Sequence, residues 1–173
     1  MLWITRTRIR VNRAATGWLV RRFIDPAASF RFVEPGEVAR IQFEEGGLGF
    51  DAPGARYPHK DIQGRCSFEA LVHECCPCDP ALRELARIVH WADFPEEMET
   101  AGARSSRAAE AFDRLSLTGA VGRTAPMAMK DAVGLRTISR GFPLITKDDH
   151  ETLARSAFLY DALYASLRER SGP

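Results

Sequence analysis

Hydrophobic and polar residues alternate with period two at the start of the chain and with helical spacing directly afterwards. Residues 2–11 alternate along a run rich in β-branched residues, which predicts a strand with arginines on one face. Asn12 then precedes apolar residues at helical spacing, so we expect it to cap a helix that ends near Asp25. The chain is therefore expected to begin with a strand and a helix.

Two further short apolar runs extend the predicted sheet. Residues 29–33 and 48–50 are expected to be strands, each followed by a Pro-Gly or Gly-rich turn. Between them, residues 38–45 predict a helix that stops at two glycines. Residues 55–65 then predict a loop that holds His59.

The stretch from Cys66 to Asp93 predicts two helices in succession. Ser67 is expected to cap the first helix, which Pro77 ends. Asp79 caps the second, with proline in its first turn, where the missing N–H costs nothing. The buried stripe of this second helix is expected to consist of Leu82, Leu85, Ala86 and Val89.

Asp93 continues this apolar stripe. A carboxylate in such a position needs a partner, because burying it alone is expensive. His90 lies three residues earlier, within reach on a helix surface. Two side chains suited to metal ligation or acid–base chemistry therefore end an otherwise apolar helix.

The C-terminal half predicts mainly helix. Residues 94–126 have no steady period and are expected to be irregular or linker-like, apart from a helix over 108–118. Residues 127–139 predict another helix, and Thr146 is expected to cap the last one. The buried stripe of this last helix is expected to be Leu153, Ala157, Tyr160, Tyr164 and Leu167.

These elements predict an α+β fold: a small sheet near the N-terminus covered by helices, followed by a mainly α-helical C-terminal half. A chain of 173 residues, 1–173, is expected to form a single domain. No apolar run approaches the ~20 residues of a membrane span, and the first residues lack the apolar core of a signal peptide. We therefore expect a cytoplasmic protein without a membrane partner.

The four cysteines lie close together, at positions 66, 75, 76 and 78. This clustering argues against a disulfide framework across the chain. The run from His73 to Cys78 could hold a soft metal through thiolates, although its spacing is not that of a zinc finger. The alternative is a set of reduced thiols packed at a helix end.

Several short motifs, in order along nearly the whole chain, resemble the ChrB-type chromate-resistance domain of bacteria. They are Thr5-Arg6, Asn12-Arg13, the run Trp18 to Asp25, Phe50-Asp51, the run Arg65 to Glu69, the run Ile88 to Asp93, the run Asp148 to His150, and the run Tyr160 to Tyr164.

The resemblance implies a link to chromate or oxidative stress. Asn12 departs from the aspartate usual in the family, and residues 94–145 and the cluster from Cys75 to Cys78 also differ. The family that this chain resembles also includes longer regulators with an additional N-terminal region, and no counterpart of that region is expected in this sequence. DNA is therefore not an expected partner of this domain alone.

Two sites can be proposed from the sequence. A metal site is expected from His59, Glu69, His90, Asp93 and His150, because imidazole and carboxylate ligands suit zinc, iron or manganese. The alternative is that these side chains form structural polar pairs.

The second site is an oxyanion site, because arginine forks match chromate or sulfate and helix N-termini attract anions. Its candidate residues are Arg6, Arg13, Arg21 and Arg22. The alternative is a solvated basic face.

The expected function is metal or oxyanion binding in chromate resistance, as a sensor or accessory protein. The alternative is a metal-dependent oxidoreductase acting in chromate or oxidative-stress defence. An open coordination position would favour the enzyme, and closed coordination would favour the binding protein.

Overall fold

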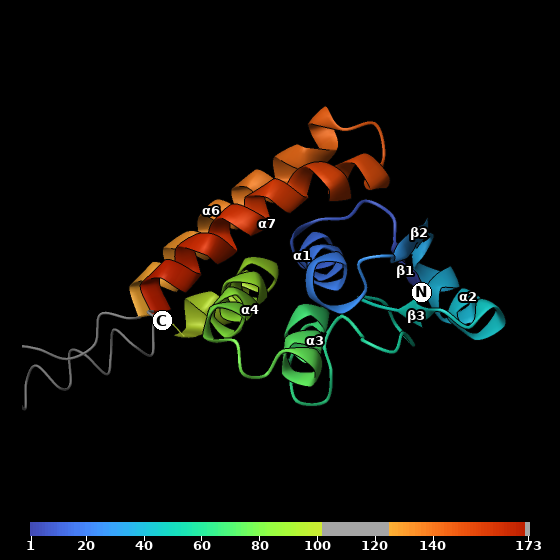
Figure 1. Cartoon of the computed structure of the whole chain (residues 1–173), viewed down its shortest axis with the longest axis horizontal. Helices are drawn as coiled ribbons and strands as arrows, with labels where there is room; N and C mark the ends of the chain where they lie inside the picture. The colour runs from blue at the N-terminus through green and yellow to red at the C-terminus, as the bar shows by residue number, and fades with distance from the viewer. Residues whose placement is uncertain (102–124, 172–173) are drawn as a thin grey trace, which may run out of the picture.

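A three-stranded parallel sheet forms one end of the molecule (Figure 1). The computed structural model describes residues 1–101 and 125–171. Strand β1 (Leu2–Arg6) lies between β2 (Ser29–Val33) and β3 (Leu48–Gly49), and both neighbours run parallel to it. In the strand order β2-β1-β3, the chain passes from the central strand β1 to β2 at one edge of the sheet and then crosses to β3 at the other edge.

Helices cover both faces of this sheet. Helix α1 (Val11–Leu19) continues as a π-helical turn, Val20–Ile24, and connects β1 to β2. A 3-10 turn, Pro35–Glu37, leads into α2 (Val38–Glu45), which connects β2 to β3. Alternate residues of β1 point to opposite faces, so Trp3 joins the large core beneath α1 while Ile4 packs with the residues of α2.

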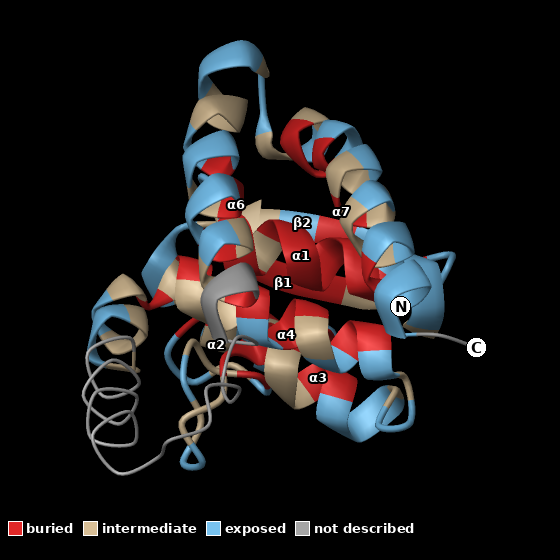
Figure 2. Cartoon of the chain, turned by 90° about the vertical axis from the view of Figure 1, so that its left-hand side faces the viewer, coloured by how far each residue is buried: buried red, intermediate tan, exposed pale blue. Residues whose placement is uncertain are grey.

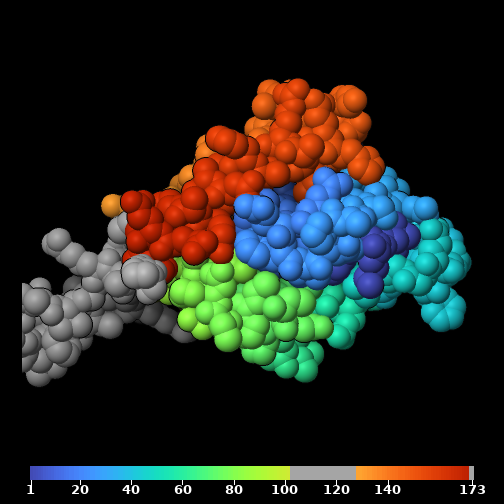
Figure 3. Space-filling view, viewed as in Figure 1, coloured from blue at the N-terminus to red at the C-terminus, as the bar shows by residue number. Residues whose placement is uncertain are grey.

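The remaining helices add two further layers, which the space-filling view shows stacked on α1 (Figure 3). Helices α3 (Ser67–Cys75) and α4 (Pro80–Asp93) lie on one side. Helices α6 (Ala125–Ile145) and α7 (Asp149–Ser171) form a long antiparallel pair on the other side. Buried residues concentrate where these layers face the sheet and α1, and exposed residues cover the outer surfaces (Figure 2).

The predicted strand over residues 2–11 is too long. Strand β1 ends at Arg6, and the backbone reverses at Arg8, whose φ is +57°. The carboxylate of Asp149 accepts hydrogen bonds from the backbone N–H groups of Arg8 and Ile9, at 2.9 and 2.8 Å. A contact with the start of the last helix therefore holds the turn. The alternation of residues 2–11 could not indicate where the strand ends, because this contact comes from a distant part of the chain.

The prediction that Asn12 caps a helix is also wrong. Helix α1 starts at Val11 after Arg10, and no side chain caps it. Asn12 lies inside the helix and is buried, which frees its amide for contacts elsewhere. The predicted strand 29–33 and helix 38–45 are confirmed, whereas β3 ends at Gly49 and Phe50 only bridges to Tyr57.

In the C-terminal half, Asp148 rather than Thr146 caps the last helix. Its Oδ1 accepts the backbone N–H of Glu151 at 2.8 Å. Helix α6 runs on through Pro143, which lies in its last turn and removes one hydrogen bond without ending the helix.

The segment expected to be irregular is in part helical. Residues 95–101 form helix instead of a loop. The rest of that segment up to residue 124, including the helix expected over 108–118, lies outside the described residues.

The α+β class is confirmed, with a small sheet near the N-terminus and a mainly helical C-terminal half. The expected buried stripe of α4 is confirmed, since all four of its apolar residues from Leu82 to Val89 are buried. The stripe of α7 is confirmed in part: Leu153, Tyr160 and Leu167 are buried, whereas Ala157 and Tyr164 are half-buried and pack against the core. Among the helices that the structure describes, none combines the length and apolar character needed to cross a membrane.

Gly17 in α1 allows α7 to approach closely. A Cβ atom at this position would lie 2.6 Å from Cδ1 of Leu153, a side chain that is itself buried. We expect Gly17→Ala to lower the free energy of unfolding by about 1–3 kcal/mol through overpacking. Gly134→Ala, at a helical position with nothing within 4 Å of the new Cβ, should raise it by about 0.5–1 kcal/mol. Urea denaturation of both variants tests this, and equal effects would contradict it.

Candidate functional site

The candidate site lies where the carboxyl ends of β1 and β3 meet. Arg6 is the last residue of β1, and Asp51 follows β3 after one bridging residue. Because the chain leaves β1 toward β2 and returns at β3, this edge is a topological switch point, the usual place for ligands in parallel sheets. Two charged residues of opposite sign therefore meet at the position where the fold favours a binding site.

Asp51 is the centre of a dense polar network. Its side chain is 1% exposed, and its φ of +55° is uncommon for a residue other than glycine. Its Oδ2 accepts hydrogen bonds from Arg6 Nη2 at 2.9 Å and Arg13 Nη1 at 2.7 Å. Burial alone would raise the pKa of Asp51, but the hydrogen bond from His59 and the charges of Arg13, His59 and Arg6 hold it below its usual value.

Asn12 ties this network to the start of α3. Its Nδ2 donates to Asp51 Oδ1 at 2.8 Å. Its Oδ1 accepts from the backbone N–H of Phe68 at 3.2 Å and from the hydroxyl of Ser67 at 3.1 Å. Asn12 therefore satisfies a free N–H in the first turn of α3 instead of capping its own helix.

His59 and Asp93 complete the group around Asp51. His59 Nδ1 lies 2.6 Å from Asp51 Oδ1 and 3.7 Å from Asp93 Oδ2. The hydrogen bond to Asp51 raises the pKa of His59. We call Asp51, His59 and Asp93 the Asp51 group; one potential ligand atom from each lies within 4.8 Å of the others.

Asp93 is the least satisfied member of this group. Its side chain is only 20% exposed, and its Oδ2 is buried without a hydrogen-bond partner. Burial raises the pKa of Asp93 to about 6, and the nearby charge of Asp51 adds to the shift. Asp93 continues the face of α4 that the sequence predicted to turn inward. Its poorly compensated carboxylate therefore lies beside His59.

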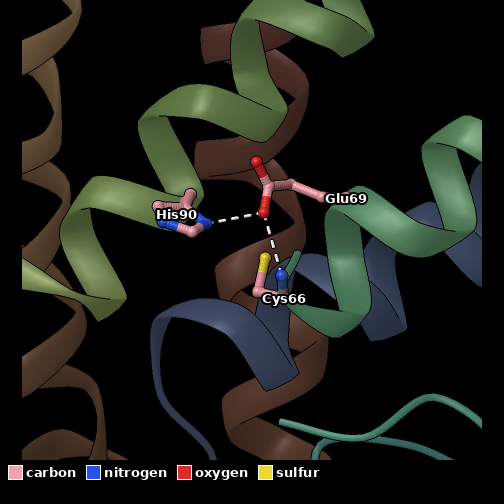
Figure 4. A group of neighbouring side chains, drawn as sticks. All are labelled: Cys66, Glu69 and His90. Carbon is pink, nitrogen blue, oxygen red and sulfur yellow. Dashed lines mark hydrogen bonds and ion pairs between the residues drawn. The ribbon is translucent and has the colours of Figure 1, made fainter. Parts of the chain in front are cut away.

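A second group lies between α3 and α4, and Figure 4 shows its three side chains, those of Cys66, Glu69 and His90. Glu69 Oε2 lies between the other two: it accepts the backbone N–H of Cys66 at 2.9 Å and lies 2.6 Å from His90 Nδ1. The other imidazole nitrogen, Nε2, is 3.1 Å from Glu97, which is paired with Lys60. We call Cys66, Glu69 and His90 the Cys66 group.

Phe94 links the two groups. Its ring centroid lies 4.9 Å from the ring of His59 and 4.9 Å from the ring of His90. Two histidines, each paired with a carboxylate through Nδ1, therefore contact one phenylalanine at the C-terminal end of α4.

The structure divides the sequence-derived metal set instead of joining it. His59 and Asp93 belong to the Asp51 group, and Glu69 and His90 belong to the Cys66 group. His150 belongs to neither; its exposed ring packs edge-on against Phe32.

The candidate anion-binding arginines also separate. Arg6 and Arg13 both bind Asp51, so a carboxylate stands where an oxyanion was expected. Arg21 lies over the ring of Phe30, and Arg22 pairs with Asp161.

Sequence reasoning missed Asp51 and Cys66 as site residues. Asp51 follows a predicted strand, and a polar residue at the carboxyl end of a parallel strand is a usable signal. That signal needs the strand order, which the sequence did not provide. Cys66 has no comparable local signal, because a buried cysteine usually serves as a small apolar side chain.

Comparison with known proteins identifies related sequences. A family model described as ChrB, C-terminal domain, matches residues 3–121. Protein ChrB of Cupriavidus metallidurans (strain ATCC 43123 / DSM 2839 / NBRC 102507 / CH34) is 39% identical over 92 residues, which cover 53% of this chain. The match covers 26% of that relative, so the chain corresponds to about a quarter of its length. No solved structure matches the chain.

Asp51 should be a main determinant of stability. Asp51→Asn keeps the shape and tolerates the left-handed backbone, but leaves Arg6 and Arg13 without their carboxylate. We expect the free energy of unfolding to fall by about 3 kcal/mol. Glu84→Gln, which breaks the exposed pair with Arg87, should change it little. Chemical denaturation measures both, and a small effect at Asp51 would contradict the assignment.

Asp93 should make the metal-free protein less stable as the pH rises. Its pKa is about 6 in the folded state against an ordinary 3.8, so between these values the folded state holds more protons than the unfolded chain. Stability should therefore fall as the pH rises through this range. In buffer with chelator, Asp93→Asn should exceed the wild type by about 1–3 kcal/mol at neutral pH and match it near about pH 4. A difference that does not vary with pH would contradict this.

Proposed function

The chain belongs to the ChrB C-terminal domain family, and on that premise we propose that it acts in chromate resistance by binding a divalent metal ion in the Asp51 group. The family match confirms the resemblance to the ChrB-type chromate-resistance domain. The proposal joins this association with chromate to the chemistry of the polar groups beside β1 and β3.

The unpartnered Oδ2 of Asp93 carries the proposal. A buried carboxylate oxygen without a hydrogen bond is costly, and in native structures such an atom calls for an explanation. A cation placed between Asp93 and His59 would remove this cost. The ion would also favour the ionised form of Asp93, whose pKa is raised in its absence.

The donor set supports a particular class of metal. The ligand atoms would be those that already face one another, Asp51 Oδ1, His59 Nδ1 and Asp93 Oδ2, one nitrogen and two oxygens. These donors suit zinc, iron or manganese. Asn12 and Arg13 would hold Asp51 in place through its existing hydrogen bonds, as partners outside the coordination sphere commonly do.

The same site offers a role for the arginines. The carboxylates of Asp51 and Asp93 balance the guanidinium groups of Arg6 and Arg13, so a divalent ion would leave the site with net positive charge. Chromate or a related oxyanion would then be attracted to the bound metal. Such a site would suit a sensor or accessory protein, since binding of the anion would depend on the metal.

Metal binding should depend on His59 and Asp93 and not on His150. We expect Asp93→Asn and His59→Ala each to weaken Mn²⁺ or Zn²⁺ binding at this site by a factor of about 100 or more. His150→Ala is the matched control, because this histidine is exposed and lies in neither group. Equilibrium dialysis with elemental analysis measures the binding. The protein used has all four cysteines replaced by alanine or serine, so that no thiol binds the metal and only this site is measured.

Binding that survives both substitutions would rule out the Asp51 group as the ligand set. If the wild type binds no metal, the group is a structural polar network instead. A second measurement adds chromate or sulfate to the loaded protein. The melting temperature should rise with anion concentration only when metal is present.

A further inference from the structure

We propose that the Cys66 group is a second, separate metal site, which takes zinc through one thiolate, one carboxylate and one imidazole. The three donors come from Cys66, Glu69 and His90 at the facing ends of α3 and α4 (Figure 4). The inference does not require the ion proposed for the Asp51 group.

The arrangement of His90 is the first argument. Both of its ring nitrogens face carboxylates, Nδ1 at 2.6 Å from Glu69 and Nε2 at 3.1 Å from Glu97. A neutral imidazole carries only one N–H, so one of these contacts would bring a lone pair against a carboxylate oxygen. The geometry therefore needs a positive species between His90 and Glu69, which is either a proton or a metal ion.

The outer contacts of His90 favour metal binding through Nδ1. Lys60 pairs with Glu97, and Glu97 in turn accepts from Nε2. A carboxylate that accepts one imidazole N–H and leaves the other nitrogen for the metal is the usual arrangement around zinc-bound histidine. Nδ1 is the nitrogen that faces Glu69 and Cys66 (Figure 4).

Cys66 supplies the donor that separates this site from the Asp51 group. Its side chain is fully buried, and burial raises its pKa well above the ordinary value, so the thiol is protonated without metal. Zinc would displace the thiol proton and the proton on Nδ1, and both would pass to solvent. No oxidation or reduction is involved.

Little movement is needed to admit the ion. Two ligands of a tetrahedral zinc ion lie about 3.3 Å apart, so Glu69 and Nδ1 must separate by roughly 0.7 Å. Glu69 is part-exposed in the first turn of α3, where its carboxylate also accepts the Cys66 N–H as the N3 partner of a capping box. Three protein donors leave a fourth position for water or a substrate, as in open zinc sites.

Cobalt(II) distinguishes the two sites, because a thiolate ligand gives it an intense near-ultraviolet charge-transfer band that nitrogen and oxygen ligands do not. The test protein carries Cys75→Ser, Cys76→Ser and Cys78→Ser, since these more exposed thiols could bind cobalt themselves. We expect one thiolate band per chain at saturation, and one equivalent of zinc should remove it.

Three variants made in the same background identify the ligands. Cys66 is the one thiol left in this background, so the band itself reports on it. His90→Ala and Glu69→Gln should each weaken cobalt binding at least tenfold, and the amide oxygen of the glutamine can still accept the Cys66 N–H. Asp93→Asn, from the Asp51 group, should leave the band unchanged. Circular dichroism melts confirm that each variant is folded.

The result that overturns the proposal is a folded test protein without the near-ultraviolet band, or a cobalt affinity that neither His90→Ala nor Glu69→Gln lowers. The test is independent of the function proposed above. Loss of metal from the Asp51 group alone would leave the thiolate band in place, and loss of the band alone would leave binding by His59 and Asp93 intact.

Discussion

A buried carboxylate, that of Asp51, is the constraint on which this corner of the molecule depends. A charge with almost no access to water is tolerated only when paired and hydrogen-bonded on every side. Arg6 comes from β1, Arg13 and Asn12 from α1, and His59 from the loop after β3. Satisfying one carboxylate therefore fixes the relative positions of a strand, a helix and a loop.

The C-terminal helix supports this corner from outside. Asp149 holds the turn between β1 and α1, and the hydroxyl of Tyr160 donates to the carbonyl of Val11 at 2.8 Å. Because Arg13 lies on α1, the start of α7 helps to set the direction from which this arginine reaches Asp51. The site thus depends on contacts between the two ends of the described chain.

The two histidine–carboxylate pairs beside Phe94 are alike in geometry and different in chemistry. The Asp51 group offers oxygen and nitrogen next to two arginines, while the Cys66 group adds a thiol beneath a histidine held by Glu97. Ligand type is a main basis for metal selectivity in proteins, so the two groups are suited to different ions. The proposed association of metal with oxyanion belongs to the first group only, because Arg6 and Arg13 lie there.

The sequence by itself determined those elements whose signals are local. Asp79 and Pro80 start α4, residues 38–45 form α2, and the apolar stripe from Leu82 to Val89 is buried, because capping and periodicity depend on near neighbours. The motifs of the ChrB family were also readable in order along the chain. Tertiary structure alone decided that β1 ends at Arg6, that Asn12 serves α3, and that Glu69 and His90 lie apart from His150. These outcomes depend on which distant segments meet, and contacts such as that of Asp149 with Arg8 leave no trace in the spacing of adjacent residues.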